Sequence, residues 1–246
     1  EYSEDSTFYS IAYTMLLNFD NLQNLSINDV ANLCHVSKST ISKFVRSLNF
    51  EDYSDFKAEA YFKENRFNSD YNYIANQDAN TYIDKVIQDI EIIKNIDMTV
   101  IRKIAQIIYQ YPKVTAFGTL FSQLGALDLQ YKLAYNHKFI MSYVNDVKQD
   151  EYLKNNSEQG VVIIYSNSGN YLNKYQLSSF DEKKKYDYKN KKVILITANE
   201  MMVNHPDVDI CLVYQHLSKL QTHSYIYPLI NDLIVAEYRS FQNANF

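Results

Sequence analysis

Residues 25–50 read LSINDVANLCHVSKSTISKFVRSLNF and predict two short helices joined by a tight turn. Ser26 can cap the N-terminus of the first helix, and Asp29 three residues later completes a capping box. Ser37 can cap the second helix in the same way. Apolar residues recur at helical spacing in both helices, and we expect the following to be buried: Val30, Leu33, Cys34, Ile41, Phe44, Val45 and Leu48. The stretch therefore predicts a small helical hairpin.

The second predicted helix has a polar and basic outer face. No carboxylate occurs between Asp29 and Glu51, although the whole chain carries a formal charge of -5. Hydroxyls near a helix N-terminus can reach base edges or phosphates, and Lys and Arg neutralise phosphates. The face therefore favours contact with DNA, and a hairpin with a merely solvated basic face is the alternative. The residues that we expect to contact DNA are Ser37, Lys38, Ser39, Thr40, Ser42, Lys43 and Arg46.

The run VSKSTISKFVRSLNFEDYSDFK at residues 36–57 resembles the helix-turn-helix of the RpiR family of bacterial transcription regulators. The matching positions are Val36, Ser37, Thr40, Phe44, Leu48, Phe50, Tyr53, Phe56 and Lys57. Lys43 departs from the family pattern by replacing an arginine, and Asn49 and Asp52 replace glycines. Asparagine tolerates the left-handed conformation of a helix C-cap, whereas lysine lacks the bidentate fork of arginine. The resemblance implies a DNA-binding domain.

The remainder of the chain predicts an α/β domain. We expect helices at about 7–19, 52–66, 82–94, 99–111 and 223–241. Five short apolar runs alternate with helical segments, at 114–117, 139–142, 161–165, 193–197 and 210–214. Such alternation predicts βαβ units and a parallel sheet covered on both faces. The expected organisation is an all-α helix-turn-helix domain at 1–67, a linker at 68–80 and a doubly wound α/β domain with a five-stranded parallel sheet at 81–246.

A polar loop, Ser166-Asn167-Ser168-Gly169-Asn170, follows the third predicted strand and precedes a predicted helix. Loops at the carboxyl ends of parallel strands are where such sheets bind ligands. Hydroxyls together with the N–H groups of a helix N-terminus suit a phosphate. The loop therefore indicates a phosphate site, and an ordinary polar turn is the alternative.

This half of the chain resembles the sugar isomerase (SIS) domain, the phosphosugar-binding module that follows the helix-turn-helix in the RpiR family. Residues 117–122 (FGTLFS) fill the first loop of the family pattern, and Ala126, Asp128, Lys132 and Leu133 match the helix after it. The resemblance implies a doubly wound SIS-like fold. It also implies a set of ligand contacts: Gly118, Ser122, Ser166, Asn167, Ser168, Gly169, Tyr171 and Thr197.

Two positions depart from the SIS pattern. Leu120 replaces a glycine that lets the backbone approach the ligand, and Tyr171 replaces a threonine whose hydroxyl helps to hold the phosphate. Leucine can narrow the pocket, and tyrosine can reach a different atom of the ligand. A sugar phosphate is the expected ligand, and a pocket that has lost its ligand and serves only for dimerisation is the alternative.

These features predict a cytoplasmic, dimeric transcription regulator that binds an inverted-repeat operator, senses a sugar phosphate and controls carbohydrate or amino-sugar metabolism genes. The alternatives are a ligand-blind DNA-binding dimer and a sugar-phosphate isomerase on the same fold. An isomerase needs an acid and a base, and the candidates near the loops are Asp128, Asp207, Asp209 and His223. We expect no enzyme, because no glutamate follows a matched motif and the helix-turn-helix would remain unexplained.

No cofactor or metal is expected. His216 and His223 could share a helix face, but no cysteine or carboxylate completes a metal-binding set with them. Cys34 and Cys211 lie in separate predicted elements and are expected to be packed thiols, which suits a reducing compartment. No apolar run approaches the roughly 18 residues of a membrane span.

Overall fold

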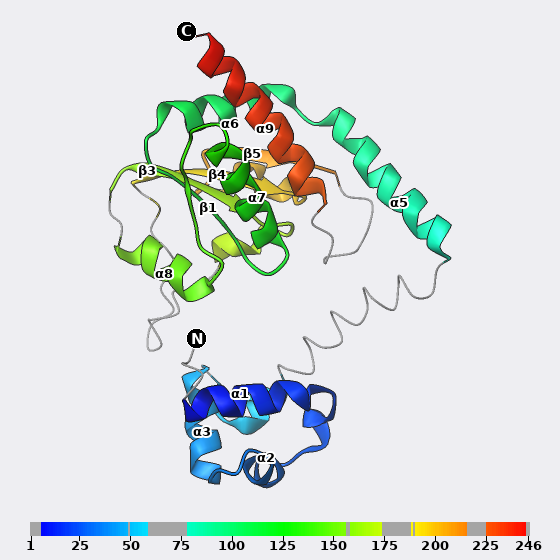
Figure 1. Cartoon of the computed structure of the whole chain (residues 1–246), viewed down its shortest axis with the longest axis vertical. Coiled ribbons are helices and arrows are strands. Elements are labelled where there is room, and N and C mark those ends of the chain that lie inside the picture. The colour runs from blue at the N-terminus through cyan, green and yellow to red at the C-terminus, as the bar shows by residue number, and fades with distance from the viewer. Residues whose placement is uncertain are drawn as a thin grey trace. The chain divides into compact units, whose positions relative to one another are not determined.

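The computed structural model describes residues 6–48, 50–58, 78–155, 158–173, 188, 190–215 and 225–244. The chain forms two compact units, Glu1–Tyr73 and Ile74–Phe246, which are drawn in Figure 1. Of the expected linker at 68–80, only residues 78–80 lie within the described residues, and a helix already begins at Ala79.

The first unit is helical. Its elements are α1 (Thr7–Leu17), the 3-10 helix η1 (Phe19–Asn24), α2 (Ile27–Leu33) and α3 (Lys38–Ser47). A further helix is described from residue 53 to 58, and the rest of the helix expected at 52–66 lies outside the described residues. One core unites these helices, and it consists of Ile11, Met15, Leu22, Val30, Ala31, Ile41, Phe44, Val45 and Tyr53. The first unit thus has the helical hairpin that the sequence predicts.

Both expected helix caps are present. The Ser26 hydroxyl accepts a hydrogen bond from the N–H of Asp29, and the Asp29 carboxylate accepts one from the N–H of Ser26, so the capping box is complete. These bonds from Ser26 hold the pKa of Asp29 below its usual value. The Ser37 hydroxyl accepts from the N–H of Thr40 and so caps α3.

Some residues expected to be buried are exposed. Leu33 and Leu48 lie at the C-terminal ends of α2 and α3 and are exposed. The prediction of burial was wrong for these two residues, because the helical spacing of apolar residues continues to the end of the helix, whereas the neighbouring helices that would cover them do not extend so far. Cys34, which caps the end of α2, is only partly buried against the core.

The second unit is an α/β domain. Its helices are α5 (Ala79–Ile92), α6 (Met98–Gln110), α7 (Ser122–Ala134), α8 (Asp146–Asn155) and α9 (Ile226–Asn243), with 3-10 helices η2 (Ile93–Asn95), η3 (Asn170–Asn173) and η4 (Glu200–Asn204). Its strands are β1 (Val114–Gly118), β2 (Met141–Ser142), β3 (Gly160–Tyr165), β4 (Lys191–Thr197) and β5 (Ile210–Val213). All neighbouring strands pair in parallel in the order β2-β1-β3-β4-β5. The predicted fold class, a five-stranded parallel sheet after a helical domain, is confirmed.

The sheet is covered on both faces because its strands carry apolar side chains in both directions. Ile163 packs in the core that α6, α7 and α9 cover, whereas Ile164 packs in the core on the side of α8, η3 and η4. Figure 1 shows α7 and α9 lying together across one face of the sheet.

The edge strand β2 is shorter than the predicted run at 139–142, and Phe139 is exposed rather than buried. A strand at the edge has one neighbour only, so an apolar run there is not enclosed.

Candidate functional site

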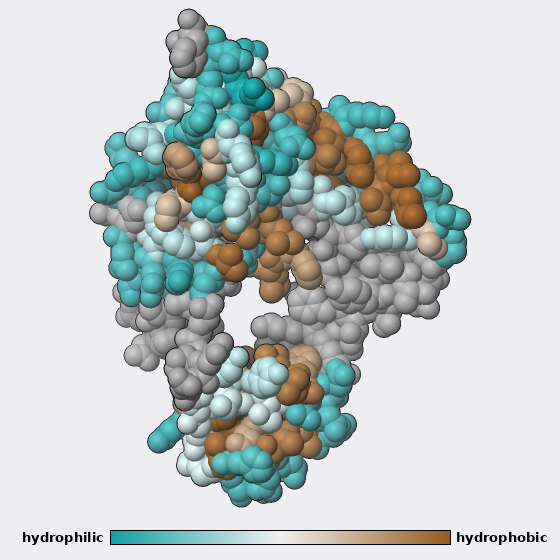
Figure 2. Space-filling view, in the orientation of Figure 1, coloured by the Kyte–Doolittle hydropathy of each residue, from teal (hydrophilic) through white to brown (hydrophobic). Residues whose placement is uncertain are grey.

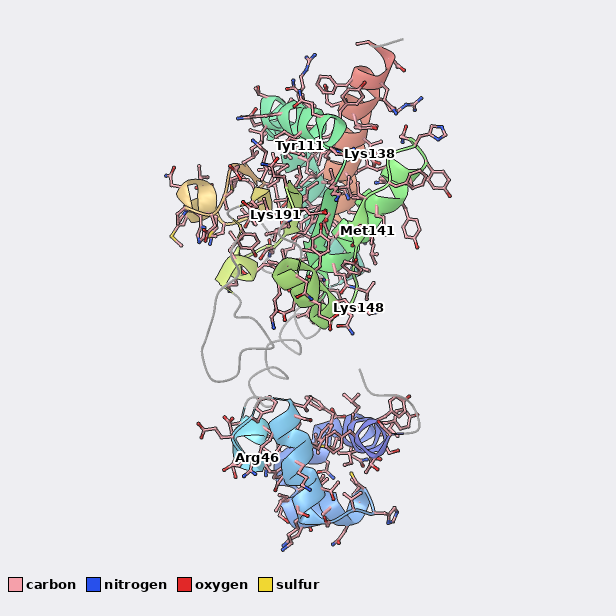
Figure 3. All side chains as sticks on the ribbon, turned by 90° about the vertical axis from the view of Figure 1, so that its left-hand side faces the viewer. Arg46, Tyr111, Lys138, Met141, Lys148 and Lys191 are labelled. Carbon is pink, nitrogen blue, oxygen red and sulfur yellow. The ribbon has the colours of Figure 1, made fainter. Side chains whose placement is uncertain are left out.

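The α3 helix presents its polar side chains to solvent. Ile41, Phe44 and Val45 are buried, which turns the opposite side of the helix outward. Of the residues expected to contact DNA, five are exposed and two are half-buried: Ser37, Lys38, Ser39, Lys43 and Arg46 are exposed, and Thr40 and Ser42 are half-buried. Figure 3 labels Arg46 in this unit. We refer to these seven residues as the α3 face.

Hydroxyl groups gather at the N-terminus of α3. The Oγ of Ser37 lies 2.7 Å from the Oγ of Ser39 and 2.8 Å from the Oγ1 of Thr40. The Nε of Arg46 donates a long hydrogen bond of 3.4 Å to the backbone oxygen of Glu51. The α3 face therefore combines a helix N-terminus, which favours anions, with three exposed basic side chains, Lys38, Lys43 and Arg46.

The loop after β1 makes a very close turn. A Cβ on Gly118 would lie 2.7 Å from the backbone of Ser122, so only glycine fits at this position. Leu120 adopts a φ of 52°, the left-handed conformation that glycine adopts most easily, and its side chain is exposed. The SIS pattern has a glycine here, and the backbone of this loop keeps the conformation that a glycine would favour.

The loop after β3 uses its hydroxyls to hold its own backbone. The Oγ of Ser166 accepts a 3.3 Å hydrogen bond from the N–H of Tyr171, and the Oγ of Ser168 accepts one of 3.3 Å from the N–H of Asn170. Gly169 turns the chain with a φ of 78°. The loop continues into the 3-10 helix η3, and residues 174–187 lie outside the described residues. The backbone N–H groups of Asn167 and Ser168 donate to no acceptor in the described part of the chain.

Thr197 and Tyr171, two of the expected ligand contacts, are buried and bonded inside the protein. The fully buried Thr197 hydroxyl donates to the backbone oxygen of Asn167 at 3.0 Å. The Tyr171 hydroxyl donates to the Oε1 of Gln149 at 2.7 Å, and the Nε2 of Gln149 donates to the backbone oxygen of Gly118 at 2.8 Å. Tyr171 and Gln149 thus connect the loop after β3 to the loop after β1.

A second connection joins the same two loops on the other face of the sheet. The hydroxyl of Tyr214, just after β5, donates to the Oδ1 of Asn167 at 2.9 Å and lies 3.2 Å from the hydroxyl of Tyr227. The Tyr227 hydroxyl in turn lies 3.2 Å from the Oγ of Ser122. Burial raises the pKa of Tyr214 and of Tyr227, so both hydroxyls keep their protons. The sequence pattern did not indicate Gln149, Tyr214 or Tyr227, because each reaches the loops from a distant segment.

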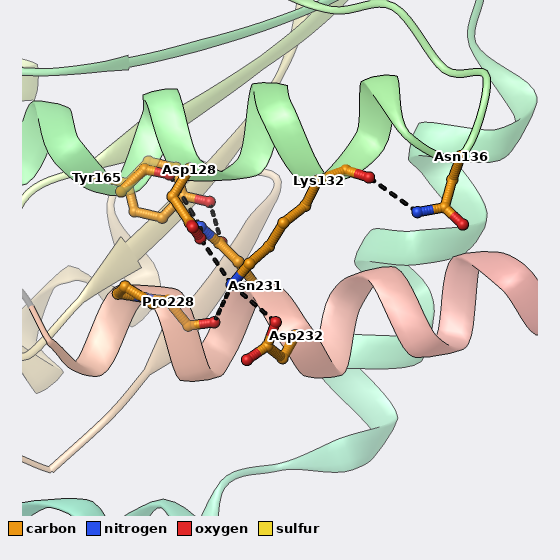
Figure 4. Close-up of polar contacts among 8 residues, drawn as sticks. Asp128, Lys132, Asn136, Tyr165, Pro228, Asn231 and Asp232 are labelled. Atoms are coloured by element: carbon orange, nitrogen blue, oxygen red, sulfur yellow. Dashed lines mark hydrogen bonds and ion pairs between the residues drawn. The ribbon is translucent and has the colours of Figure 1, made fainter.

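The charged residues of the SIS helix motif, Asp128 and Lys132, interact with each other and with α9. Asp128 accepts from the Nδ2 of Asn231 at 2.9 Å and forms an ion pair with Lys132 at 2.9 Å (Figure 4). Lys132 also pairs with Asp232 at 2.7 Å. The hydroxyl of Tyr165, the last residue of β3, donates to the Oδ1 of Asn231 at 2.5 Å. This network fastens α7 to α9 and both helices to the end of β3.

Within the described residues, no three His, Cys, Asp or Glu side chains gather as a metal-binding group. His216 and His223 lie outside those residues. None of the helices in the described ranges has the length and apolar character needed to cross a membrane.

Comparison with known proteins decides the family of the first unit. Residues 8–61 match the helix-turn-helix domain of the rpiR family. The first unit is an RpiR-type helix-turn-helix domain. The resemblance that residues 36–57 carry is thereby confirmed, and a domain of this type implies DNA binding.

One relative among curated proteins is an uncharacterized HTH-type transcriptional regulator in the aarA 3' region of Providencia stuartii. It is 23% identical to this chain over 171 residues, which cover 65% of this chain and 60% of the relative. The chain thus spans less than two thirds of the length of that relative.

Three solved structures resemble the chain. The NanR protein of Vibrio vulnificus complexed with ManNAc-6P is 16% identical and has a TM-score of 0.49, with coverage of 97% of this chain and 88% of that chain. A putative phosphosugar isomerase involved in capsule formation from Bacteroides fragilis is 17% identical, with a TM-score of 0.50 and coverage of 66% and 91%. The sugar isomerase domain of an RpiR transcription factor from Sphaerobacter thermophilus is 14% identical, with a TM-score of 0.48 and the same coverage. At these identities the likeness to the isomerase concerns the fold alone, and the α/β unit has that SIS-like fold.

Proposed function

We propose that the protein is a transcription regulator whose RpiR-type domain binds operator DNA through the α3 face. The observation that carries this proposal is the exposure of Lys43 and Arg46 on the second helix of a helix-turn-helix, with the hydroxyl cluster at its N-terminus. In helix-turn-helix domains the second helix lies in the major groove, where hydroxyls reach bases and basic side chains reach phosphates.

The regulator acts as a homodimer on an inverted repeat. Two copies related by a two-fold axis present two α3 helices, so the half-sites are separated by about one helical turn or a multiple of it. Selection of binding sequences from a pool of random DNA tests this directly. Inverted repeats are expected, whereas enrichment of a single unrepeated site would contradict the dimeric mode of binding.

The α/β unit binds a sugar phosphate at the loops after β1 and β3. The N–H groups of Asn167 and Ser168 and the hydroxyls of Ser122, Ser166 and Ser168 lie at the carboxyl ends of neighbouring parallel strands. N–H groups and hydroxyls at such an edge favour a phosphate dianion over a neutral sugar, because charge-assisted hydrogen bonds are the stronger ones. The ligand changes DNA affinity to the extent that it binds the two conformations of the regulator differently.

The positions and partners of the candidate aspartates favour a ligand sensor over an isomerase. Asp128 is paired with Lys132 and Asn231, and an Oδ of Asp209 accepts the N–H of Val193 at 2.7 Å. Asp207 and Asp209 come just before β5, and the amino end of this strand lies at the opposite edge of the parallel sheet from the loops after β1 and β3. Neither of these two aspartates is therefore placed to act there as the base that aldose–ketose isomerisation needs. His223, another candidate for acid–base chemistry, lies outside the described residues.

The ligand proposal is tested by thermal shift with a panel of hexose and amino-sugar phosphates and their unphosphorylated counterparts. A sugar phosphate should raise the melting temperature by mass action, and the unphosphorylated sugar should not. The double variant Ser166→Ala/Ser168→Ala should lose the shift. The control Ser240→Ala, which removes a hydroxyl from α9 far along the chain, should keep it. A panel in which no sugar phosphate changes the melting temperature would contradict the ligand proposal.

A further inference from the structure

The α5 helix buries a carboxyl group and exposes isoleucines. Within its range, Ala79–Ile92, all of which the structure describes, Asp89 is the one buried residue, and it is fully buried. Ile83, Ile87 and Ile90 expose 39% to 49% of their surface, and in Figure 2 a brown band lies over the position of α5. A helix that is held by the hydrophobic effect alone buries its apolar side and exposes its carboxyl groups. The attachment of α5 to the α/β unit therefore includes a polar contact at its most buried position.

That contact joins α5 to the residue just before α9. The hydroxyl of Tyr225 donates to the Oδ2 of Asp89 at 2.8 Å, across 136 residues of sequence. Burial raises the pKa of Tyr225, and the bond to Asp89 raises it further, so the hydroxyl keeps its proton and remains a donor. The core of the α/β unit takes Ile93 and Ile96, which follow α5, but no described residue of α5 itself. A directional hydrogen bond therefore helps to set the position of α5 against the start of α9.

The start of α9 also carries the contact to the ligand loops. Tyr227 lies two residues after Tyr225, and its hydroxyl is 3.2 Å from the Oγ of Ser122 and 3.2 Å from the hydroxyl of Tyr214. The Tyr227 ring packs edge-on against the rings of Tyr165 and Tyr214, with the centroids 5.1 Å and 5.8 Å away. Side chains packed this closely have little freedom to move independently. A displacement of the Ser122 hydroxyl is therefore passed on to the start of α9.

A cavity beside the end of α5 gives the helix room to move. It has a volume of about 210 Å³, and its lining includes Ile92, Ile93, Glu200 and Tyr214. An interior packed at the usual density would hold α5 in a single position, because packed cores do not deform continuously. The cavity adjoins the same tyrosine network, through Tyr214, and leaves space for a second position of α5.

We propose that the Asp89–Tyr225 hydrogen bond couples the ligand loops to α5, and through α5 to DNA binding. A sugar phosphate at the loops after β1 and β3 displaces Tyr227, the start of α9 carries Tyr225 with it, and Tyr225 moves α5 through Asp89. Because α5 is the first described element after the RpiR-type domain in the sequence, a change in its position changes the DNA affinity of the regulator. Asp89 and Tyr225 are thus positioning residues. The inference rests on the proposed function, since it needs a ligand at these loops and DNA at the RpiR-type domain.

The alternative is that the bond only stabilises the fold. A buried hydrogen bond contributes to stability whether or not a ligand binds. A stabilising role alone predicts that variants melt at a lower temperature while the response of their DNA affinity to the ligand is unchanged. The two roles therefore differ in one quantity, the ratio of the DNA dissociation constants measured with and without the ligand.

The test is a fluorescence anisotropy titration of the full chain with DNA selected by the wild type. The probe is whichever of glucose 6-phosphate, glucosamine 6-phosphate and N-acetylglucosamine 6-phosphate gives the largest thermal shift with the wild type. The probe should change the DNA dissociation constant at least about fivefold in the wild type and less than about twofold in Tyr225→Phe. The thermal shift should remain in this variant, because the ligand loops are unaltered. Circular dichroism melting establishes that each variant is folded.

Two control variants carry the same kinds of substitution at other places. Tyr238→Phe removes a buried tyrosine hydroxyl further along α9, and Asp84→Asn changes an exposed aspartate of α5. Both should respond to the probe as the wild type does. Asp89→Asn keeps an acceptor for Tyr225 without the charge, so its response should fall between those of the wild type and Tyr225→Phe, because charge-assisted hydrogen bonds are the stronger ones.

A Tyr225→Phe variant that responds to the probe as the wild type does would overturn the inference and leave the proposed function standing. If that variant does not fold, Asp89→Asn decides in its place, and an unchanged response would have the same meaning. Loss of the thermal shift in Tyr225→Phe would assign its effect to ligand binding, and loss of the response in a control would assign it to a general loosening of the unit. Either result would also overturn the inference. A wild type that responds to none of the three probes would overturn it together with the ligand part of the proposed function.

Discussion

The α3 face and the loops after β1 and β3 carry similar polar residues but use them in opposite ways. On α3 most of these side chains point into solvent, and only the Ser37 hydroxyl is committed to the cap. At the strand ends, Tyr171 and Thr197 are buried and bonded to other parts of the chain. In a helix, the spacing of the residues predicts which polar side chains face solvent. In a loop, the sequence gives the residue types but does not predict where their side chains point.

Removing the Asn231 side chain should produce the largest effect, because it breaks the buried network that joins α7, α9 and the end of β3. Asn231→Ala leaves the Tyr165 hydroxyl and an Asp128 oxygen without this buried partner. We expect a loss of about 3 kcal/mol in the free energy of unfolding of the α/β unit. Chemical denaturation measures it, with Asn243→Ala at the exposed end of α9 as the control. A loss below about 1 kcal/mol would mean that the network adds little to the stability of the α/β unit.

Replacing Tyr171 by phenylalanine tests whether this residue of the loop after β3 stabilises the fold or contacts the ligand. The change removes the hydroxyl that donates to Gln149 and should cost about 1–2 kcal/mol of stability, since both groups are buried. The thermal shift with a sugar phosphate should persist, because this hydroxyl is buried and already donates to Gln149. Tyr135→Phe, at an exposed position, should change neither quantity. A stable Tyr171→Phe variant that has lost the thermal shift would instead make Tyr171 a ligand contact.

Two substitutions of Ser37 distinguish its contribution to the stability of α3 from its contribution to DNA binding. Ser37→Ala should destabilise the RpiR-type domain by about 1 kcal/mol, because the N–H of Thr40 loses its acceptor. Ser37→Asp should restore the stability, since aspartate also caps helices, but should weaken DNA binding by placing a negative charge on the α3 face. Melting curves and fluorescence anisotropy with selected DNA measure the two effects. Equal DNA affinity for Ser37→Asp and the wild type would place Ser37 away from the phosphates.

The sequence was informative where local chemistry decides the structure. Both helix caps were predicted correctly from Ser26 and Ser37. The apolar runs predicted five parallel strands, because the strands of a parallel sheet that is buried on both faces are apolar on both faces. It failed where distant segments decide. Tyr227 meets Ser122 across 105 residues and Gln149 meets Tyr171 across 22, and no local pattern encodes either contact. The apolar run at 139–142 predicted a strand that includes Phe139, but β2 begins only at Met141, and Phe139 is exposed at the edge of the sheet.

The most direct test of the α3 face is a salt-dependent anisotropy titration with DNA selected by the wild type. Lys43→Ala/Arg46→Ala is compared with Lys103→Ala, which removes an exposed lysine from α6 in the α/β unit. Each lost phosphate contact should lower the slope of log affinity against log salt by about 0.9. The double variant should therefore bind at least about tenfold more weakly with a flatter slope, and Lys103→Ala should bind as the wild type does. Unchanged affinity and slope in the double variant would contradict the assignment of α3 as the DNA-binding helix.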